Sequence, residues 1–93
     1  MDPLEFRRAR LQWGLSQREM AALVGTRTSR TVRKWEHSER QIPDAAIILV
    51  ELYRRYPGLL EEVPQLRHDV GIPPVSDAEH EEAQRAGAES VPA

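Results

Sequence analysis

Basic side chains recur at short intervals between residues 27 and 40. They are Arg27, Arg30, Arg33, Lys34 and Arg40. Guanidinium and ammonium groups donate hydrogen bonds to phosphate oxygens, and the arginine fork can bond O6 and N7 of one guanine together. The chemistry that these residue types favour is the binding of a polyanion such as DNA. The alternative is an ordinary solvated helix face.

The charge of the chain is unevenly distributed. The formal net charge is −2, which taken alone argues against nucleic acid. Residues 1–40, however, carry nine arginine or lysine residues against five acidic ones, whereas residues 67–93 carry two against six. Because salt screens charges beyond about 8 to 10 Å, the local excess matters more for phosphate than the total.

The basic side chains fall on a predicted helix over residues 28–36. Thr28 or Ser29 can cap its start, and Val32 and Trp35 share the inward side. The other faces carry Ser29, Arg30, Arg33 and Lys34. Pairs four residues apart stack on a helix surface, so these side chains form a polar, cationic face about two turns long.

A second short helix is predicted directly before it. Ser16 and Glu19 form a capping-box pattern, and Gly25 ends the helix because glycine adopts the left-handed conformation at little cost. The small Ala21 allows a following helix to cross closely. A helix this short is not stable alone, so it must pack. Two short helices joined by a tight turn predict a helix-turn-helix.

The remaining elements are predicted to be helical as well. Asp2 and Pro3 suit the start of a first helix that Gly14 ends, and its apolar stripe includes Trp13, which like Trp35 we assign to the core. A fourth helix is expected from Ala45 to about Tyr56, buried on more than one side, followed by a short turn over Leu59–Val63 that ends before Pro64. The expected fold class is all-α, with four to five helices.

The chain divides into two predicted parts. Residues 1–66 form a DNA-binding and dimerisation domain, with Ile48, Leu52, Leu59 and Leu60 near the dimer contact because they exceed what one small core can bury. Residues 67–93 form a disordered or weakly helical acidic tail that begins with an extended linker over residues 70–75.

The residues of the first half resemble one family. The positions that carry the resemblance are Arg10, Gly14-Leu15-Ser16-Gln17, Glu19, Ala21, Val24-Gly25, Thr31-Val32 and Trp35-Glu36. Over residues 6–56 they are similar to the lambda-repressor/Cro-like, or XRE-type, transcription regulators. The stretch Tyr56–Leu60 also looks like the DNA-binding half of some antitoxins. Two departures are present: the interval from Gly25 to Trp35 is one residue longer than usual, and Ser38 stands where the family usually has glycine.

The resemblance implies a lambda-repressor-like domain and a role for each matching position. It implies that Gln17 contacts phosphate and braces the recognition helix, and that Arg10 and Glu36 form an ion pair between the first and third helices. It also implies that Ser29, Arg30 and Lys34 meet base edges, with Arg33 beside them. Arg27 and Arg40 flank that helix and suit phosphate. The predicted DNA-binding residues are Gln17, Arg27, Thr28, Ser29, Arg30, Arg33, Lys34 and Arg40.

The function expected from this pattern is sequence-specific regulation of transcription, as a repressor. One recognition helix contacts few base pairs, so a homodimer on a palindromic operator is expected. The alternative is an antitoxin-type module that neutralises a partner protein through the acidic tail and regulates its own operon.

Several other classes find no support in the sequence. The chain has no cysteine, and His37, His68 and His80 lack ligand spacing, so no metal or cofactor site is expected. No histidine or acid pattern surrounds Ser16, so we predict that the chain is not an enzyme. Without a long apolar run or a secretory signal, a cytoplasmic location without membrane contact is expected.

Overall fold

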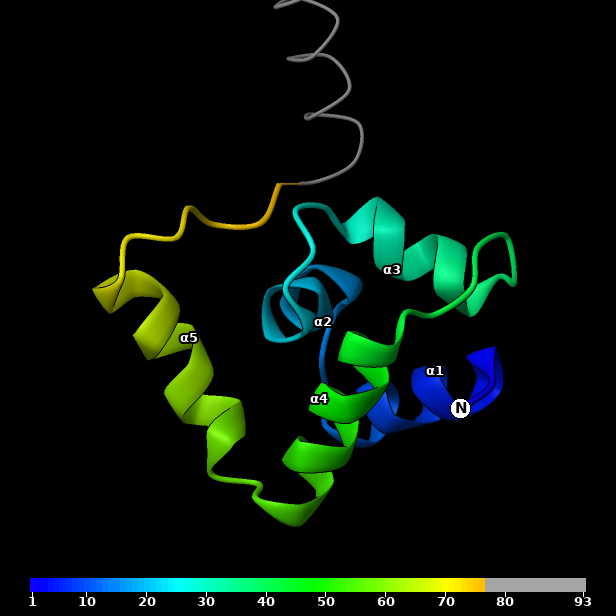
Figure 1. The fold of residues 1–93 in the computed structure, drawn as a ribbon, viewed down its shortest axis with the longest axis horizontal. Coiled ribbons are helices and arrows are strands. Elements are labelled where there is room, and N and C mark those ends of the chain that lie inside the picture. The colour runs from blue at the N-terminus through cyan, green and yellow to red at the C-terminus, as the bar shows by residue number, and fades with distance from the viewer. Residues whose placement is uncertain (77–93) are drawn as a thin grey trace, which may run out of the picture.

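The fold of the described residues, 1–76 in a computed structural model, consists of helices joined by short connections (Figure 1). The helices are α1 (Pro3–Gln12), α2 (Gln17–Val24), α3 (Ser29–Glu36), α4 (Asp44–Arg55) and α5 (Leu59–Asp69). No β-strand occurs within residues 1–76. The predicted all-α class is confirmed, with five helices where four to five were expected. Of the tail predicted for residues 67–93, residues 77–93 lie outside the described part of the chain.

The first three helices begin where their side chains can cap them. Asp2 Oδ1 accepts a hydrogen bond from the Glu5 N–H at 2.8 Å. The capping box at α2 is complete, with 3.0 Å bonds from the Glu19 N–H to Ser16 Oγ and from the Ser16 N–H to Glu19 Oε1. Thr28, rather than Ser29, caps α3. Each cap satisfies a backbone donor that has no partner within its own helix.

The core lies between α1, α2, α3 and α4. It includes Phe6, Ala9, Met20, Ala21, Val24, Val32, Trp35, Ile42, Ala46 and Val50. The ring of Phe6 meets that of Trp35 edge to face, with centroids 5.6 Å apart. Trp13 is half-buried against the core and contacts Tyr53 in the same manner at 6.2 Å. Both tryptophans therefore have the core roles predicted for them.

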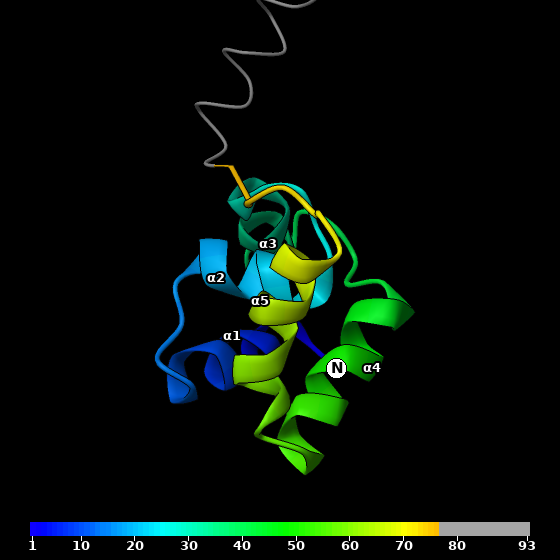
Figure 2. The ribbon, with the colours of Figure 1, turned by 90° about the vertical axis from the view of Figure 1, so that its left-hand side faces the viewer.

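Helix α4 buries one side and exposes another. Ala46, Val50 and Tyr53 are buried, whereas Ile48 is 60% exposed and Leu52 37% exposed. The predicted burial on more than one side is not found, because α2 contacts α4 on one side and α5 covers only part of the rest. Figure 2 shows the outer side of α4 free of other helices of the described chain.

Helix α5 corrects the prediction of a short turn. It continues through Pro64 to Asp69, although proline removes one helical hydrogen bond. Val63 and Leu66 line an apolar hollow together with Leu49 and Tyr53, and this apolar packing favours continuation of the helix beyond the proline. No residue of α5 is buried. The helix thus attaches to the domain through partly covered side chains only.

The segment that follows α5, residues 70–76, returns across the domain to the start of α3, and we call it the strap (Figures 1 and 2). Val75 is only 5% exposed and belongs to the core. Thr28 and Ser76 form a parallel bridge. The folded unit therefore extends at least to Ser76, beyond the boundary predicted at residue 66. Within residues 1–76, no helix is long and apolar enough to cross a membrane.

Candidate nucleic-acid interface

A partly buried ion pair fixes the end of α3 to the rest of the domain. Arg10 donates from Nε to Glu36 Oε2 at 2.7 Å and from Nη2 to Oε1 at 2.9 Å, and the Glu36 side chain is 2% exposed. Arg10 Nη1 also donates to the Leu15 carbonyl at 2.9 Å. The pair implied by the family resemblance is present. It ties α3 to α1 and to the connection before α2, so the orientation of α3 is fixed by paired, directional contacts.

Gln17 takes part in the same network. Its Nε2 donates to Glu36 Oε1 at 3.3 Å, and the residue is half-buried. The bracing role predicted for Gln17 therefore has a structural basis in a bond to the last residue of α3. Its predicted contact with phosphate stays a prediction.

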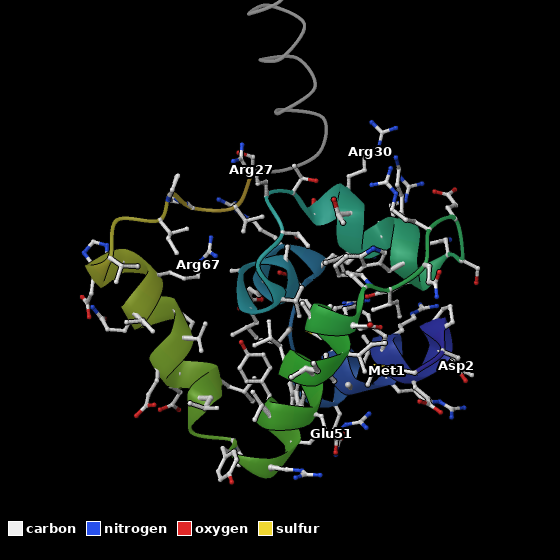
Figure 3. All side chains as sticks on the ribbon, in the orientation of Figure 1. Met1, Asp2, Arg27, Arg30, Glu51 and Arg67 are labelled. Carbon is white, nitrogen blue, oxygen red and sulfur yellow. The ribbon has the colours of Figure 1, made fainter. Side chains whose placement is uncertain are left out.

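Helix α3 separates its apolar and basic side chains. Val32 and Trp35 are buried, whereas Arg33 is exposed and Arg30 and Lys34 are partly exposed. Arg27, in the connection before α3, is exposed as well. Figure 3 shows Arg27 and Arg30 extending from the outer side of the domain, away from α1 and α4. We call Arg27, Arg30, Arg33 and Lys34 the basic face.

The start of α3 is shared with the strap. The Thr28 hydroxyl accepts from the Thr31 N–H, while the Ser29 N–H donates to the Ser76 carbonyl at 3.3 Å. In return, the Ser76 N–H donates to the Arg27 carbonyl at 3.3 Å. Thr28 and Ser29 thus lie at the start of α3, with backbone groups on both sides of Thr28 bonded to the strap.

The loop after α3 explains one departure from the family pattern. Ser38 has a φ of +59°, the left-handed conformation that a glycine adopts more easily. The Glu39 N–H donates to the Lys34 carbonyl at 2.9 Å, so the end of α3 is closed without the glycine. Arg40 is exposed in this loop and is separated in sequence from the basic face.

Sequence reasoning did not find the strap contacts. Arg18 Nε donates to the Val75 carbonyl at 2.9 Å, and Arg67 Nη2 donates to the Pro73 carbonyl at 3.1 Å. The available signal was the pair of apolar residues, Ile72 and Val75, on either side of two prolines in an otherwise polar region. Of these two, only Val75 is buried in the core, whereas Ile72 is 45% exposed.

Local hydrogen bonds at the start of α2 perturb the carboxylate of Glu19. The Ser16 backbone N–H and hydroxyl lower the pKa of Glu19 by hydrogen bonding to its carboxylate. Among residues 1–76, no group of three or more His, Asp or Glu side chains is placed to hold a metal ion. The geometry of the described residues thus offers a cationic helix face without a clustered metal site.

No protein-family model matches this chain, and neither a curated protein nor a solved structure matches it significantly. The family resemblance therefore rests on the residues that carry it.

Proposed function

We propose that this protein is a sequence-specific DNA-binding regulator of transcription, a repressor that acts in the cytoplasm as a homodimer on a palindromic operator. The recognition element is α3, which lies in the major groove. The observation that carries the proposal is the division of α3 into two faces: Val32 and Trp35 are buried, while Arg30, Arg33 and Lys34 remain accessible on the other sides. A groove about 12 Å wide admits one helix with such a face.

The proposal is supported by how firmly α3 is held. Recognition of base edges needs side chains at fixed positions, and this requires a rigid helix. The ion pair between Arg10 and Glu36 holds the end of α3, Trp35 packs on Phe6, and the Thr28 cap holds the start. These contacts hold both ends of α3 in place on the domain.

Different basic residues have different proposed roles. Arg30, in the first turn of α3, is the reader of base edges, because a guanidinium fork can bond guanine in two places. Arg27 precedes the helix and is exposed, and we assign it to a phosphate. Arg33 and Lys34 lie in the last turn, where they also interact favourably with the helix dipole.

Homodimer formation is proposed through the outer side of α4. Ile48, Leu52 and Tyr56 follow one another at intervals of four residues and are all exposed. Leu59 and Leu60, which follow Tyr56 closely in the sequence, are half-buried. In a dimer about a twofold axis through such a row, the two copies of α3 would have to meet half-sites about 34 Å apart, or a multiple of that distance, to bind one face of the DNA.

The first test is selection of duplexes from a random pool by the purified protein. The expected result is an inverted repeat whose half-sites are spaced by whole helical turns. Recovery of no common sequence, together with no binding of random DNA at low salt, would contradict the proposed function.

The second test uses the selected operator and compares two substitutions. Arg30→Ala should lower operator affinity by about 1 to 3 kcal/mol and relax preference at one base position. Arg27→Ala should weaken operator and random DNA alike and reduce the salt slope by about one unit. Arg54→Ala removes an equal charge at the end of α4 remote from α3 (Figure 1). It should change neither the affinity for operator nor the affinity for random DNA. Equal losses on both DNAs for Arg30→Ala and Arg27→Ala would refute this division of roles.

A further inference from the structure

We propose that the acidic side chains that follow Ser76, beginning with Asp77 and Glu79, bind the basic face of their own chain and compete there with DNA phosphate. This inference rests on the DNA-binding function proposed above. It assigns a second occupant to the same surface, namely a segment of this protein.

The strap holds Ser76 at the start of α3. Two backbone hydrogen bonds of 3.3 Å join Ser76 to Arg27 and Ser29, on either side of Thr28. The preceding residue, Val75, is 5% exposed within the core, and its carbonyl accepts from Arg18 Nε at 2.9 Å. The chain therefore leaves the described domain at a fixed place, between Arg27 and the first turn of α3.

The strap already forms a hydrogen bond with a backbone N–H group that could otherwise bind phosphate. The free N–H groups at the start of a helix, together with the helix dipole, attract phosphate oxygens. At α3 the N–H of Ser29 instead donates to the Ser76 carbonyl. A phosphate that approaches this N–H must displace the end of the strap or bind beside it. The contact between strap and helix is thus in direct competition with one mode of DNA binding.

The charges on the two sides are complementary. Carboxylates follow Ser76 at Asp77, Glu79, Glu81 and Glu82. An extended chain advances about 3.3 to 3.6 Å per residue, and one turn of helix is about 5.4 Å, so the first two carboxylates can reach Arg27 and Arg30 from Ser76. Later ones can reach Arg33. A short tether gives such groups an effective concentration in the millimolar range.

The competition has a defined thermodynamic form. If the acidic segment must leave before DNA can bind, it lowers the affinity for every duplex by the same factor, whether operator or random. The factor shrinks as salt rises, because the contact is electrostatic and exposed. The salt dependence of DNA binding is also shallower in the natural chain. When DNA displaces the acidic segment, the released carboxylates attract cations from solution, so fewer cations are released in total.

The test uses the full chain, its neutralised form and a matched control. The neutralised form is Asp77→Asn with Glu79→Gln. The control, Glu61→Gln with Glu62→Gln, makes the same change of net charge in the first turn of α5, at the opposite end of the molecule from α3 (Figures 1 and 2). Binding of a fluorescent random-sequence duplex is measured at salt concentrations from about 50 mM upward. Without DNA, the amide and guanidinium signals of Arg27, Ser29 and Arg30 are compared by NMR.

We expect the neutralised form to bind the duplex about tenfold more tightly at the lowest salt, with the two curves converging at high salt. The control should differ from the natural chain by much less. The NMR signals at the start of α3 should shift on neutralisation and should shift in the natural chain when salt is added.

Failure of this inference differs from failure of the proposed function. Equal DNA affinities for all three forms, with unchanged NMR signals, would overturn the inference and leave DNA binding intact. Absence of DNA binding in every form would overturn the proposed function and the competition with it. A gain in affinity of the same size in the control would also overturn the inference, because total charge and not position would then explain it.

Discussion

Arg10 and Glu36 form an ion pair that is largely removed from solvent. The Glu36 side chain is 2% exposed and the Arg10 side chain 10% exposed, and two short hydrogen bonds join them. Removing two charges from water is costly, so the pair itself adds little stability. If one partner is removed, the other charge stays buried without an opposite charge to offset that cost. The value of the pair is therefore positional, since it fixes the direction of α3.

Substitution of one partner should be more harmful than substitution of both. Arg10→Met or Glu36→Leu alone is expected to lower the free energy of unfolding by about 3 to 5 kcal/mol, because each leaves an unpaired buried charge. The double variant should lose less than the sum, with a coupling that a double-mutant cycle in urea measures. As a control, Arg54→Ala breaks an exposed pair with Glu51 at 3.6 Å and should cost well below about 1 kcal/mol. If the loss in the double variant equals the sum of the two single losses, Arg10 and Glu36 are not coupled as proposed.

Tyr53 links α4 to the end of α2 through its hydroxyl, which donates to the Leu23 carbonyl. The side chain is 1% exposed, and burial raises the pKa of its phenol, while the positive charge of Arg67 opposes that change. A group whose pKa is raised in the folded state stabilises it below the unfolded pKa, here 10.0, and the stabilisation disappears as pH rises through the folded value. Unfolding should thus become easier above pH 10.

Tyr53→Phe removes both the hydrogen bond of the hydroxyl and the titration of the phenol, and the two effects are observed at different pH. It should cost about 1 to 2 kcal/mol near neutral pH, because the Leu23 carbonyl loses its buried donor. It should also lose stability less steeply than the natural chain when pH is raised above 10, as chemical denaturation at several pH values would show. Tyr56→Phe is the matched control, because Tyr56 is 60% exposed. The same alkaline slope in both variants would exclude Tyr53 as its source.

At the scale of elements, the end of α3 is a place where the chain uses a residue poorly suited to its conformation. Ser38 has a φ of +59° and is exposed in the loop between α3 and α4. The left-handed region costs a residue with a Cβ roughly 1 to 2 kcal/mol, and glycine avoids most of that cost. The loop closes nonetheless, because backbone hydrogen bonds from His37, Ser38 and Glu39 satisfy the last carbonyls of α3.

Ser38→Gly should therefore raise the free energy of unfolding by about 0.5 to 1 kcal/mol, after the larger entropy of glycine in the unfolded chain is subtracted. Thermal unfolding followed by circular dichroism is the measurement. Gln41→Gly, in the same loop but without a positive φ, should instead destabilise the protein slightly. A lower melting temperature for Ser38→Gly would show that the serine hydroxyl outweighs the strain.

The beginnings of α1, α2 and α3 were predictable because local chemistry determines them. A cap such as Ser16 with Glu19 acts between residues three positions apart, and the sequence alone contains both partners. The same holds for the inward side of α3, where Val32 and Trp35 repeat at helical spacing. The family resemblance added the ion pair between Arg10 and Glu36, which no local pattern predicts.

The elements that were not predicted depend on contacts between distant residues. Pro64 indicates a helix end by local rules, yet α5 continues because residues on both sides of it pack near α4. Val75 follows two prolines and has no local apolar pattern around it. It is buried because it packs against core residues from other elements of the fold. Ile48 is 60% exposed because no other helix of residues 1–76 covers that side of α4, and local periodicity does not contain this information.

At the scale of the whole molecule, apolar side chains on the outer side of α4 are left uncovered by the other helices of residues 1–76. Ile48, Leu52 and Tyr56 form an exposed row along α4, and α5 has no buried residue although an isolated helix of its length is marginal in water. Association of two copies about a twofold axis would cover the row with its own equivalent. The same association is what a palindromic operator requires.

Substitution at the centre of this row should dissociate the proposed dimer. Ile48→Asp places a charge where two copies would meet, so sedimentation or light scattering at tens of micromolar should change from a dimer to a monomer. Operator affinity should fall by about a hundredfold or more, because each half-site is then bound independently. Leu11→Asp is the matched control: Leu11 is 56% exposed on α1 against 60% for Ile48, and its substitution should leave the dimer intact. If the natural chain is already a monomer at these concentrations, the row on α4 does not join two copies, and a single α3 must account for all affinity for DNA.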